Sequence, residues 1–566
     1  MAEPSASRYA RCTLVACGML CAGGALAETH SPWTSPAGVW AFTGGASYHS
    51  SLTRRPFPEI SAPRWTRFYD DAGNYIRWVW EASAVVTPDL VLALGYVSAP
   101  AQPPNRPKVF AFQRDDGSQA WQADLPSISL GQFFQGSQSS LCLDVLNRDV
   151  LAVIGKKVVC LELCHGEERW VRELPRNIVN ATPVVTDDLG ERDRLFITDY
   201  DAANGDASLY CINVDEYCAT NPFQPGDIVW TAPINGGSGN TPAYLPRRLG
   251  GQGRVYVASA GHYGLAPGTV YAFPAEGDTT PDPLWSTDNV LPHGFFGGVT
   301  VVPTGLSGGT ELLVASYAFS GGIYSADMIR IDARTGAVLG AALVNRSSSM
   351  PVVIPGGQIL TTGGLEGINP GDTDTVPSLC LYSTSLMDPP ASPTTGSLVW
   401  NSAIDTWIDL DFDGVMDPGE YLNIGGYTHQ PLVSLWKGRP SIAVGSFAPG
   451  FSPSAAPSLW VLDLQLNPVH PSFVKDTVTG AGGSPSLAGP NLYSIGSEGL
   501  CAFGPEPVRF DVDCDKKVDA GDLAKWDRGQ GNRDVNGDGS VTGADRDAVV
   551  TLLRANEPAD MLEGRR

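Results

Sequence analysis

Charged residues are scarce in this chain of 566 residues, where they make up only 17% of the composition. Basic residues are the scarcer kind: 37 Lys and Arg face 60 Asp and Glu, which leaves a net charge of −23. This charge disfavours nucleic acid and anionic membrane surfaces as partners, because neither offers cations that could pair with carboxylates. It fits a calcium-rich exterior, although keeping an exported protein soluble accounts for it as well.

Several chemical signatures are also missing. The sequence has no C-x-x-C-H haem-attachment motif, since Leu161 stands three places before Cys164 where a cysteine would be needed. No Ser-His-Asp or paired-carboxylate constellation stands out. Beyond the N-terminus, no stretch approaches the ~20 apolar residues of a membrane span. These absences favour a soluble, non-catalytic mature chain without a transmembrane segment.

The N-terminus has the pattern of a signal peptide. Arg8 and Arg11 precede an apolar run at 12–22, and a small-residue cleavage pattern ends at Ala27. Cleavage after Ala27 would make the protein secreted, periplasmic or attached to the cell surface. A lipoprotein signal is the alternative, because small and apolar residues precede Cys17 as in a lipid-attachment motif.

Glycine, proline and tryptophan are abundant, with 64, 45 and 14 residues respectively. Many short strands joined by turns have this composition, whereas long surface helices need more charged residues. One short alternating strand recurs eight times: KVFAF at Lys108, KVVCLE at Lys157, SLYCIN at Ser208, TVYAF at Thr269, MIRID at Met328, SLCLY at Ser378, SLWVLD at Ser458 and GLCAF at Gly499. The spacing of about 40 to 60 residues is typical of stacked units that cannot bury both faces alone.

Two further strands precede most of these copies. One opens near proline or small residues, as in NATPVV at Asn180 and HQPLV at His429, and one lies between, as in RVYVASA at Arg254. A turn and a tryptophan follow, at Trp121, Trp170, Trp230, Trp285 and Trp400. We expect each tryptophan to begin the outer strand of its unit and to pack between neighbouring units.

This series resembles the PQQ-like repeats of quinoproteins, most closely in MIRIDARTGAV at Met328 and KVVCLELCHGEERW at Lys157. The resemblance covers about Arg64 to Pro507 and implies an all-β fold, an eight-bladed β-propeller at 65–507 that follows an N-terminal extension at 28–64. The last copy lacks its tryptophan strand. We expect the segment around Trp65 to supply that strand and to close the ring.

Quinoprotein dehydrogenases of this family hold PQQ and calcium in the central funnel, beside a catalytic Asp and a disulfide of adjacent cysteines. The sequence contains no Cys-Cys pair. Many relatives use the repeat as a scaffold, so the fold does not imply the activity. We therefore predict a propeller without PQQ that binds a protein or a glycan on one face. A PQQ-dependent dehydrogenase is the alternative.

Eight of the 11 cysteines lie beyond the signal peptide. The repeat alignment places four of them in the slot held by Ala111 and Ala272, where a small buried side chain is expected; they are Cys160, Cys211, Cys380 and Cys501. The others can form disulfides in an exported protein; they are Cys142, Cys164, Cys218 and Cys514, and the spacing also allows Cys160 with Cys164 and Cys211 with Cys218. His293 and His429 precede blade-opening strands, where they either face the central channel or have a structural role.

The C-terminal region carries two calcium-loop patterns. In DVNGDGSVTGAD, oxygen ligands stand at the places that a calcium loop requires, and Gly539 permits the sharp turn; the ligands are Asp534, Asn536, Asp538, the carbonyl of Ser540, and Asp545. In DVDCDKKVDAGD the corresponding ligands are Asp511, Asp513, Asp515, the carbonyl of Lys517, and Asp522. Lys516 replaces the turn glycine there, so this site should bind calcium less tightly.

A helical pattern follows each of the two loops. The unit resembles a dockerin, a small α-helical module with EF-hand-like calcium loops, at 508–556, with a tail at 557–566. The resemblance implies a tether to a cohesin-like partner or to a cell-surface protein. By analogy with dockerin-bearing complexes, a role as an accessory in extracellular polysaccharide breakdown is a further alternative. The recognition places depart from many known dockerins, since they hold Ala and Gly in place of hydroxyl residues.

A third loop interrupts the propeller repeats. The stretch DLDFDGVMDPGE supplies every ligand place of an EF-hand loop; the ligands are Asp409, Asp411, Asp413, the carbonyl of Val415, Asp417 and Glu420. Pro418 disfavours a regular helix after it. We expect a calcium-stapled loop at the propeller edge, and calcium as the cofactor of the whole protein.

Overall fold

The computed structural model describes most of residues 39–505 and, beyond them, residues 520–528, 543, 546, 547 and 550. The longest gaps within the first range are 98–105, 127–138, 365–375, 406–412, 414–423, 447–457 and 465–471. Strands dominate the described residues. The helices with defined bounds are η2 (Arg247–Leu249), η4 (Thr384–Leu386), α1 (Ser402–Asp405) and α2 (Ala520–Asp527).

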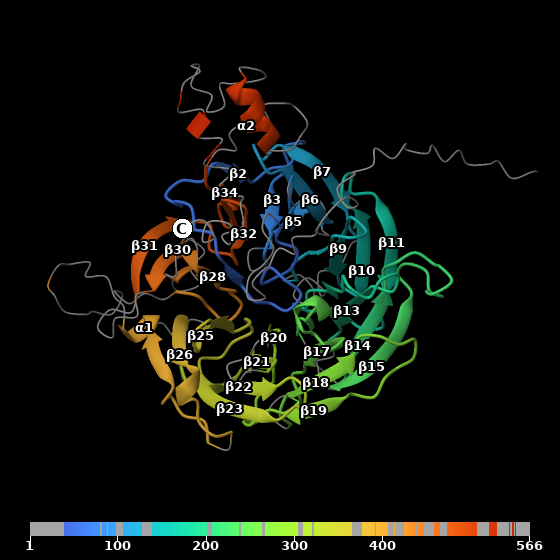
Figure 1. Cartoon of the computed structure of the whole chain (residues 1–566), viewed down its shortest axis with the longest axis vertical. Coiled ribbons are helices and arrows are strands. Elements are labelled where there is room, and N and C mark those ends of the chain that lie inside the picture. Colours follow the sequence, from blue (N-terminus) through green and yellow to red (C-terminus); the bar gives the residue numbers. More distant parts are fainter. Residues whose placement is uncertain are drawn as a thin grey trace, which may run out of the picture.

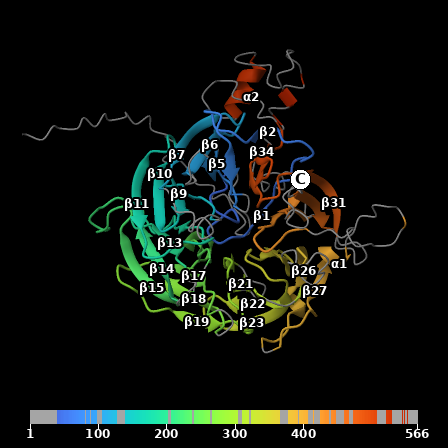
Figure 2. The same cartoon turned by 180° about the vertical axis from the view of Figure 1, so that it is seen from behind.

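Eight antiparallel sheets are arranged as the blades of a ring (Figure 1), and Figure 2 shows the same ring from behind. In five blades, four strands follow one another outward in chain order. These blades comprise β8 (Cys142–Asp144), β9 (Asp149–Ile154), β10 (Lys157–Glu162) and β11 (Glu168–Glu173); β12 (Val184–Val185), β13 (Arg194–Thr198), β14 (Asp206–Asn213) and β15 (Ile228–Asn235); β16 (Ala243–Tyr244), β17 (Arg254–Ala258), β18 (Thr269–Pro274) and β19 (Trp285–Asp288); β20 (Thr300–Val302), β21 (Glu311–Ala315), β22 (Ala326–Asp332) and β23 (Val338–Val344); and β24 (Val352–Ile354), β25 (Gln358–Gly363), β26 (Ser378–Ser383) and β27 (Leu398–Asn401).

The other three blades depart from this plan through strands near the N-terminus. One contains β28 (Leu432–Ser434), β29 (Ser441–Gly445), β30 (Ser458–Leu464) and β31 (Ser472–Thr479), with β1 (Leu52–Thr53) parallel to β28. The next contains β32 (Ser486–Ala488), β33 (Asn491–Gly496) and β34 (Gly499–Phe503), with β2 (Trp65–Arg67) beside β34. The last contains β4 (Val85–Val86), β5 (Leu90–Val97), β6 (Arg106–Gln113) and β7 (Gln119–Asp124), with β3 (Ile76–Trp78) also paired to β5.

The predicted eight-bladed all-β propeller is confirmed. All eight recurring strands lie in the third strand of a blade, from β6 to β34. The middle strands of a blade are buried on both faces, which explains why the sequence of β9, DVLAVI, is nearly all apolar. The outer strands alternate between buried and exposed residues, as in β7.

Three of the five predicted tryptophans pack between blades against a glycine in the turn of the next blade. A β-carbon built on Gly166, whose φ is +74°, would lie 2.4 Å from the Trp121 ring, so only glycine fits there. The indole Nε1 of Trp121 also donates a hydrogen bond to the carbonyl oxygen of Leu163 at 3.0 Å. The same contact joins Trp65 to Gly117, Trp170 to Gly226 and Trp285 to Gly336. The indole ring thus supplies both a packing contact and a hydrogen bond to the next blade.

The predicted slot for small residues is right for two cysteines and wrong for two. Cys160 and Cys211 lie opposite Trp170 and Trp230. In the other two blades, however, Leu381 pairs with Trp400 and Ala502 pairs with Trp65. Cys380 and Cys501 precede these partners by one residue, and a shift of one residue turns a side chain to the opposite face of a sheet. Both cysteines are buried all the same.

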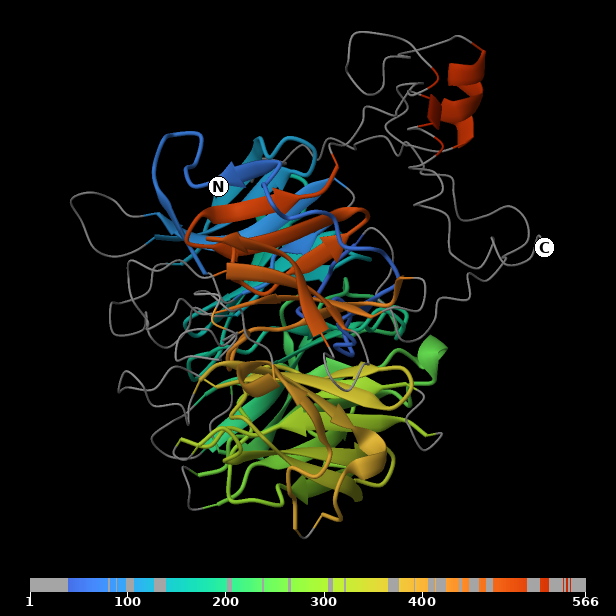
Figure 3. The ribbon, with the colours of Figure 1, turned by 90° about the vertical axis from the view of Figure 1, so that its left-hand side faces the viewer.

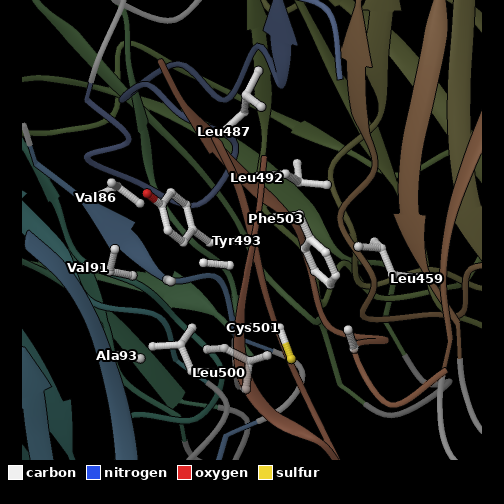
Figure 4. Packing of buried hydrophobic residues seen from close by; sticks show 14 of the residues in the cluster. Val86, Val91, Ala93, Leu459, Leu487, Leu492, Tyr493, Leu500, Cys501 and Phe503 are labelled. Carbon is white, nitrogen blue, oxygen red and sulfur yellow. The ribbon is translucent and has the colours of Figure 1, made fainter. Parts of the chain in front are cut away.

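The ring closes where β2, near the N-terminus, adds the outer strand to β34, as predicted from the missing tryptophan. Figure 4 shows the core at this closure, where Tyr493, Leu492 and Phe503 lie between the neighbouring blades. Val86 and Val91 contribute from one side and Leu459 from the other. Residues distant in sequence therefore form one core across the closure.

Helix α2 lies outside the ring of blades (Figure 3). Its last residue, Asp527, forms an ion pair with Arg546 at 2.7 Å, and the hydrogen bonds from Arg546 lower the pKa of this carboxyl group. Trp526 is buried. Among the described residues, no helix is long and apolar enough to cross a membrane.

Candidate binding site at the mouth of the central channel

Two positions before the inner strand of each blade lies a residue that is small or polar in seven blades and methionine in the eighth. Together these residues form what we call the mouth ring: Ser83, Ser140, Thr182, Thr241, Gly298, Met350, Gln430 and Ser484. In five blades a proline follows, and proline holds the preceding residue in an extended conformation. The sequence pattern of proline or small residues before a strand thus builds a ring around the channel.

Hydrogen bonds link the mouth ring from blade to blade. The backbone N–H of Ser83 donates to Ser140 Oγ at 2.9 Å, that of Ser140 to Thr182 Oγ1 at 3.0 Å, and that of Thr182 to Thr241 Oγ1 at 3.1 Å. Further round, Met350 N–H donates to Gln430 Oε1 at 2.9 Å and Gln430 N–H to Ser484 Oγ at 3.0 Å. These bonds pair polar groups at buried positions, where an unpaired group would be costly.

A segment near the N-terminus fills the channel below the mouth ring. We call residues 39–53 the plug. Their carbonyl oxygens accept hydrogen bonds from the third residue after the mouth-ring residue in five different blades. The donors are Val86, Leu143, Tyr244, Val301 and Val433, at 2.8–3.0 Å from the carbonyl oxygens of Trp40, Ala41, Ser47, Tyr48 and Ser51. The sequence predicts an N-terminal extension for these residues, whereas in the structure they lie inside the ring, on its axis.

His49 fixes the plug from within. Its Nδ1 lies 2.8 Å from the carbonyl oxygen of Thr43, and its Nε2 lies 2.9 Å from that of Pro242 on the wall. Burial lowers the pKa of His49, while the two carbonyl groups act in the opposite direction. His49 and Ser51 both have positive φ, at 56° and 48°. Such strain persists only where the surroundings hold the chain firmly, so the plug is a fitted element.

Above the plug, the channel ends in a blind cavity. The volume that the centre of a water molecule can reach in it is about 60 Å³, and the total empty space of the depression, open solvent included, is about 510 Å³. Thr43 of the plug, five hydroxyl or amide side chains of the mouth ring, and Phe296, Ser348 and Thr428 line it. None of the described lining residues carries a charge. The hydroxyl oxygens of Thr43 and Thr428 are buried without a hydrogen-bond partner among the described residues.

Phe296, which lines this cavity, belongs to a cluster of four aromatic side chains that we call the aromatic rim: Phe296, Tyr317, Phe319 and Tyr427. Four ring pairs among them have centroids 5.1–5.8 Å apart, and each of these four pairs is edge-to-face. Phe319 is 60% exposed.

The backbone and one cation hold the aromatic rim in place. Tyr317 N–H donates to the carbonyl oxygen of Gly294 at 2.9 Å, and Tyr427 N–H donates to that of Gly364 at 2.8 Å. The guanidinium of Arg346, a buried residue, lies 6.0 Å from the centroid of the Tyr317 ring. Burial raises the pKa of Tyr317, so its hydroxyl stays neutral. The rim is therefore a preformed surface.

The predicted calcium ligands lie mostly outside the described residues. In the third loop, only Asp413 is described, and it is exposed. In the C-terminal loops, the backbone of Asp522 belongs to α2, which therefore begins within the last three places of the first loop. The remaining predicted ligands, from Asp409 to Glu420 and from Asp511 to Asp545, fall outside the described part of the chain.

The histidines and cysteines do not add a second centre. His429 is fully buried beside the mouth ring, and burial lowers its pKa to about 4. His293 is partly exposed, and neither histidine lines the cavity. The seven described cysteines are all free, so neither Cys160 with Cys164 nor Cys211 with Cys218 forms a disulfide. Cys514 lies outside the described residues.

The sequence did not point to the plug or to the aromatic rim. The plug contains none of the repeat motifs, although two adjacent glycines, Gly44 and Gly45, mark its turn. The rim comes from three separate segments, HGFFGG, YAF and GGYTHQ. Glycine adjoins the aromatic residues in two of these segments, HGFFGG and GGYTHQ, and this was the available signal.

No family profile and no curated protein sequence matches this chain. Solved structures match its fold. A europium-containing methanol dehydrogenase superposes with a TM-score of 0.52 at 10% identity, covering 81% of this chain and 89% of its own. A quinohemoprotein alcohol dehydrogenase from Comamonas testosteroni gives 0.49 at 12% identity, covering 88% and 85%. BamB from Moraxella catarrhalis gives 0.44 at 15% identity, covering 75% and 94%. At such identities, the likeness shows the propeller fold alone.

Proposed function

We propose that this protein is an exported, non-catalytic propeller that binds a ligand at the mouth of its channel and is tethered through its C-terminal calcium module. The observation that carries the binding function is the plugged channel. The N-terminal segment fills the axis and leaves a blind site with a fixed wall and floor. Such a site is preorganised to hold a ligand, because little has to move when the ligand binds.

The lining residues do not fit PQQ, the cofactor that the fold family implies. PQQ is a rigid tricyclic tricarboxylate, and its negative charges need cations or many N–H donors when they leave water. The volume of the cavity, about 60 Å³, is far smaller than the roughly 300 Å³ of a small-molecule pocket. The described lining residues offer neutral hydroxyls instead of Arg or Lys. We derive no oxidation step for this site.

For the C-terminal region, we propose a calcium-folded docking module at 508–556. Two features support it: α2 begins at the end of the first loop, and the Asp527–Arg546 ion pair joins that helix to the residues after the second loop. Calcium sites are built from converging oxygen ligands, and binding then stabilises the folded form. The expected partner is a cohesin-like or cell-surface protein.

Two measurements on the full-length chain test these proposals. Calorimetric titration with calcium should find at least two sites, and the double variant D534A/D538A should lack one of them. An unchanged titration of the variant would refute the assignment of the second loop. Incubation with PQQ and calcium should produce neither a bound chromophore nor dye-linked alcohol oxidation; the appearance of either would overturn the non-catalytic function.

A further inference from the structure

We propose that a proton bound by His49 fixes the plug to the channel wall, so that mild acid makes the floor of the cavity firmer. The inference rests on the proposed binding function, whose site it regulates, but it can be tested without a ligand. Three properties of the ring lead to it: the atoms that its nitrogens face, the elements that they join, and the character of its surroundings.

Both ring nitrogens of His49 face carbonyl oxygens. Nδ1 lies 2.8 Å from the oxygen of Thr43, and Nε2 lies 2.9 Å from the oxygen of Pro242. A carbonyl oxygen only accepts hydrogen bonds, and a neutral imidazole has a single N–H group. The neutral ring can therefore donate to one oxygen, while its other nitrogen turns a lone pair toward the second oxygen. An imidazolium has two N–H groups and donates to both, so the geometry fits the protonated ring.

The two contacts join the floor of the cavity to its wall. Thr43 belongs to the plug and lines the cavity, and Pro242 follows Thr241, a mouth-ring residue that lines the cavity as well. The carbonyl oxygens of the plug also accept backbone hydrogen bonds from five blades, and these bonds need no proton. Loss of one His49 contact therefore loosens the turn that carries Thr43 without releasing the whole plug.

The plug turn can respond to such a loss. Its residues Gly44, Gly45, His49 and Ser51 all have positive φ, from 48° to 83°. For His49 and Ser51 this backbone conformation is costly and persists only where contacts hold it. When one contact is missing, the turn can relax.

The surroundings of the ring are uncharged. Burial lowers the pKa of His49, the two carbonyl groups raise it, and no charged side chain among the described residues adds to these effects. The titratable residues beside the two contacts are Tyr48 in the plug and Tyr244 in β16. Burial raises the pKa of both phenols, so both stay neutral. Proton uptake by His49 therefore depends on the contacts of the ring itself.

Acid has opposite effects on the plug and on the whole fold. Relative to the unfolded chain the pKa of His49 is lowered, so the proton binds below pH 6.5 and reduces the stability of the fold. Between two folded arrangements, however, the one with both carbonyl contacts has the higher pKa, because hydrogen bonds to the charged form favour that form. Acidification thus makes opening of the plug rarer while it makes global unfolding easier.

Hydrogen–deuterium exchange on the full-length chain without a ligand tests this proposal. The N–H groups of His49 and Ser51 donate within the plug turn, to the carbonyl oxygens of Ala46 and Gly44, and report its opening. After correction for the intrinsic exchange rate, their protection should rise about tenfold from about pH 7.5 to about pH 4.5, because one charge-assisted hydrogen bond is gained. Protection that falls or stays constant in acid would overturn the proposal, and this measurement needs no variant.

Two variants assign the effect to one ring. H49N removes the titrating group, and asparagine tolerates the positive φ of this position, so its plug should have the same protection at both pH values. The control H429N removes a second fully buried histidine and should keep the rise seen in the wild type. A rise that persists in H49N, or one that H429N abolishes, would also overturn the proposal. The PQQ and calcium tests measure other properties, so the proposed function and this inference fail separately.

Discussion

The contact between tryptophan and glycine predicts a large difference between two glycine substitutions that look alike. Gly166 and Gly190 both have φ of +74°, so alanine at either position costs about 1 kcal/mol of backbone strain. At Gly190, a new β-carbon would meet nothing within 4 Å. At Gly166, it would lie 2.4 Å from the Trp121 ring, and overpacking of this kind costs a further 1–3 kcal/mol or so.

We therefore expect G166A to lower the free energy of unfolding by about 2–4 kcal/mol and G190A by about 1 kcal/mol. Urea unfolding followed by tryptophan fluorescence measures both, with the wild-type slope as a check that the variants unfold in the same way. Equal losses would refute the reasoning, because the two positions share their φ and differ in the tryptophan. The double variant G166A/W121A tests the cause: the extra cost of G166A should vanish once the ring is gone.

Three further predictions follow from the closure of the ring, a buried histidine and the calcium loops. The variant W65A, which removes the indole ring from the closing strand, should lower the free energy of unfolding by about 3–5 kcal/mol. It should also speed amide hydrogen exchange in β2 and β34 before exchange in the other blades rises. Burial lowers the pKa of His429 from 6.5 to about 4, so between these pH values the unfolded chain binds a proton that the folded chain does not. The free energy of unfolding should therefore fall by up to roughly 3 kcal/mol as the pH drops from 6.5 to 4. The variant H429N should flatten this part of the profile of unfolding free energy against pH. Chelation of calcium should lower the helical signal of the C-terminal region, and D534A/D538A should reduce the effect; a chelator response that the variant does not alter would contradict the loop assignment.

The repeat made the propeller predictable from sequence. Each third strand carries one pattern, and a turn and a tryptophan follow five of the eight copies, so the eight copies indicated eight blades. Even the closure at Trp65 followed from counting tryptophan strands. The alignment failed only at Cys380 and Cys501, where it was one residue out. Small side chains alone do not fix the register of a strand to one residue, because Ala502 and the adjacent Cys501 are both small enough for the position opposite Trp65.

The binding site was beyond the reach of the same reasoning. The aromatic rim joins Phe296, Tyr317 and Tyr427, which come from three separate loops and share no spacing in the sequence. Their proximity depends on how the blades wrap around the axis, and a repeat pattern states only that the blades stack. The plug was missed for a related reason: it has little regular strand structure, so neither a period of two nor a period of 3.6 marks it.

The plug also links the closure of the ring to the binding site. Its carbonyl groups receive hydrogen bonds from five blades, and β1 then pairs with β28, a strand almost 400 positions later in the chain. β2 continues from the plug to the outer edge of the closing blade. The floor of the cavity is therefore complete only when the blades on both sides of the closure are in place. Contacts of such long sequence separation form late in folding, because they close large loops. The ligand site at the mouth should accordingly be absent from partly folded chains, and ligand binding should report the closed ring.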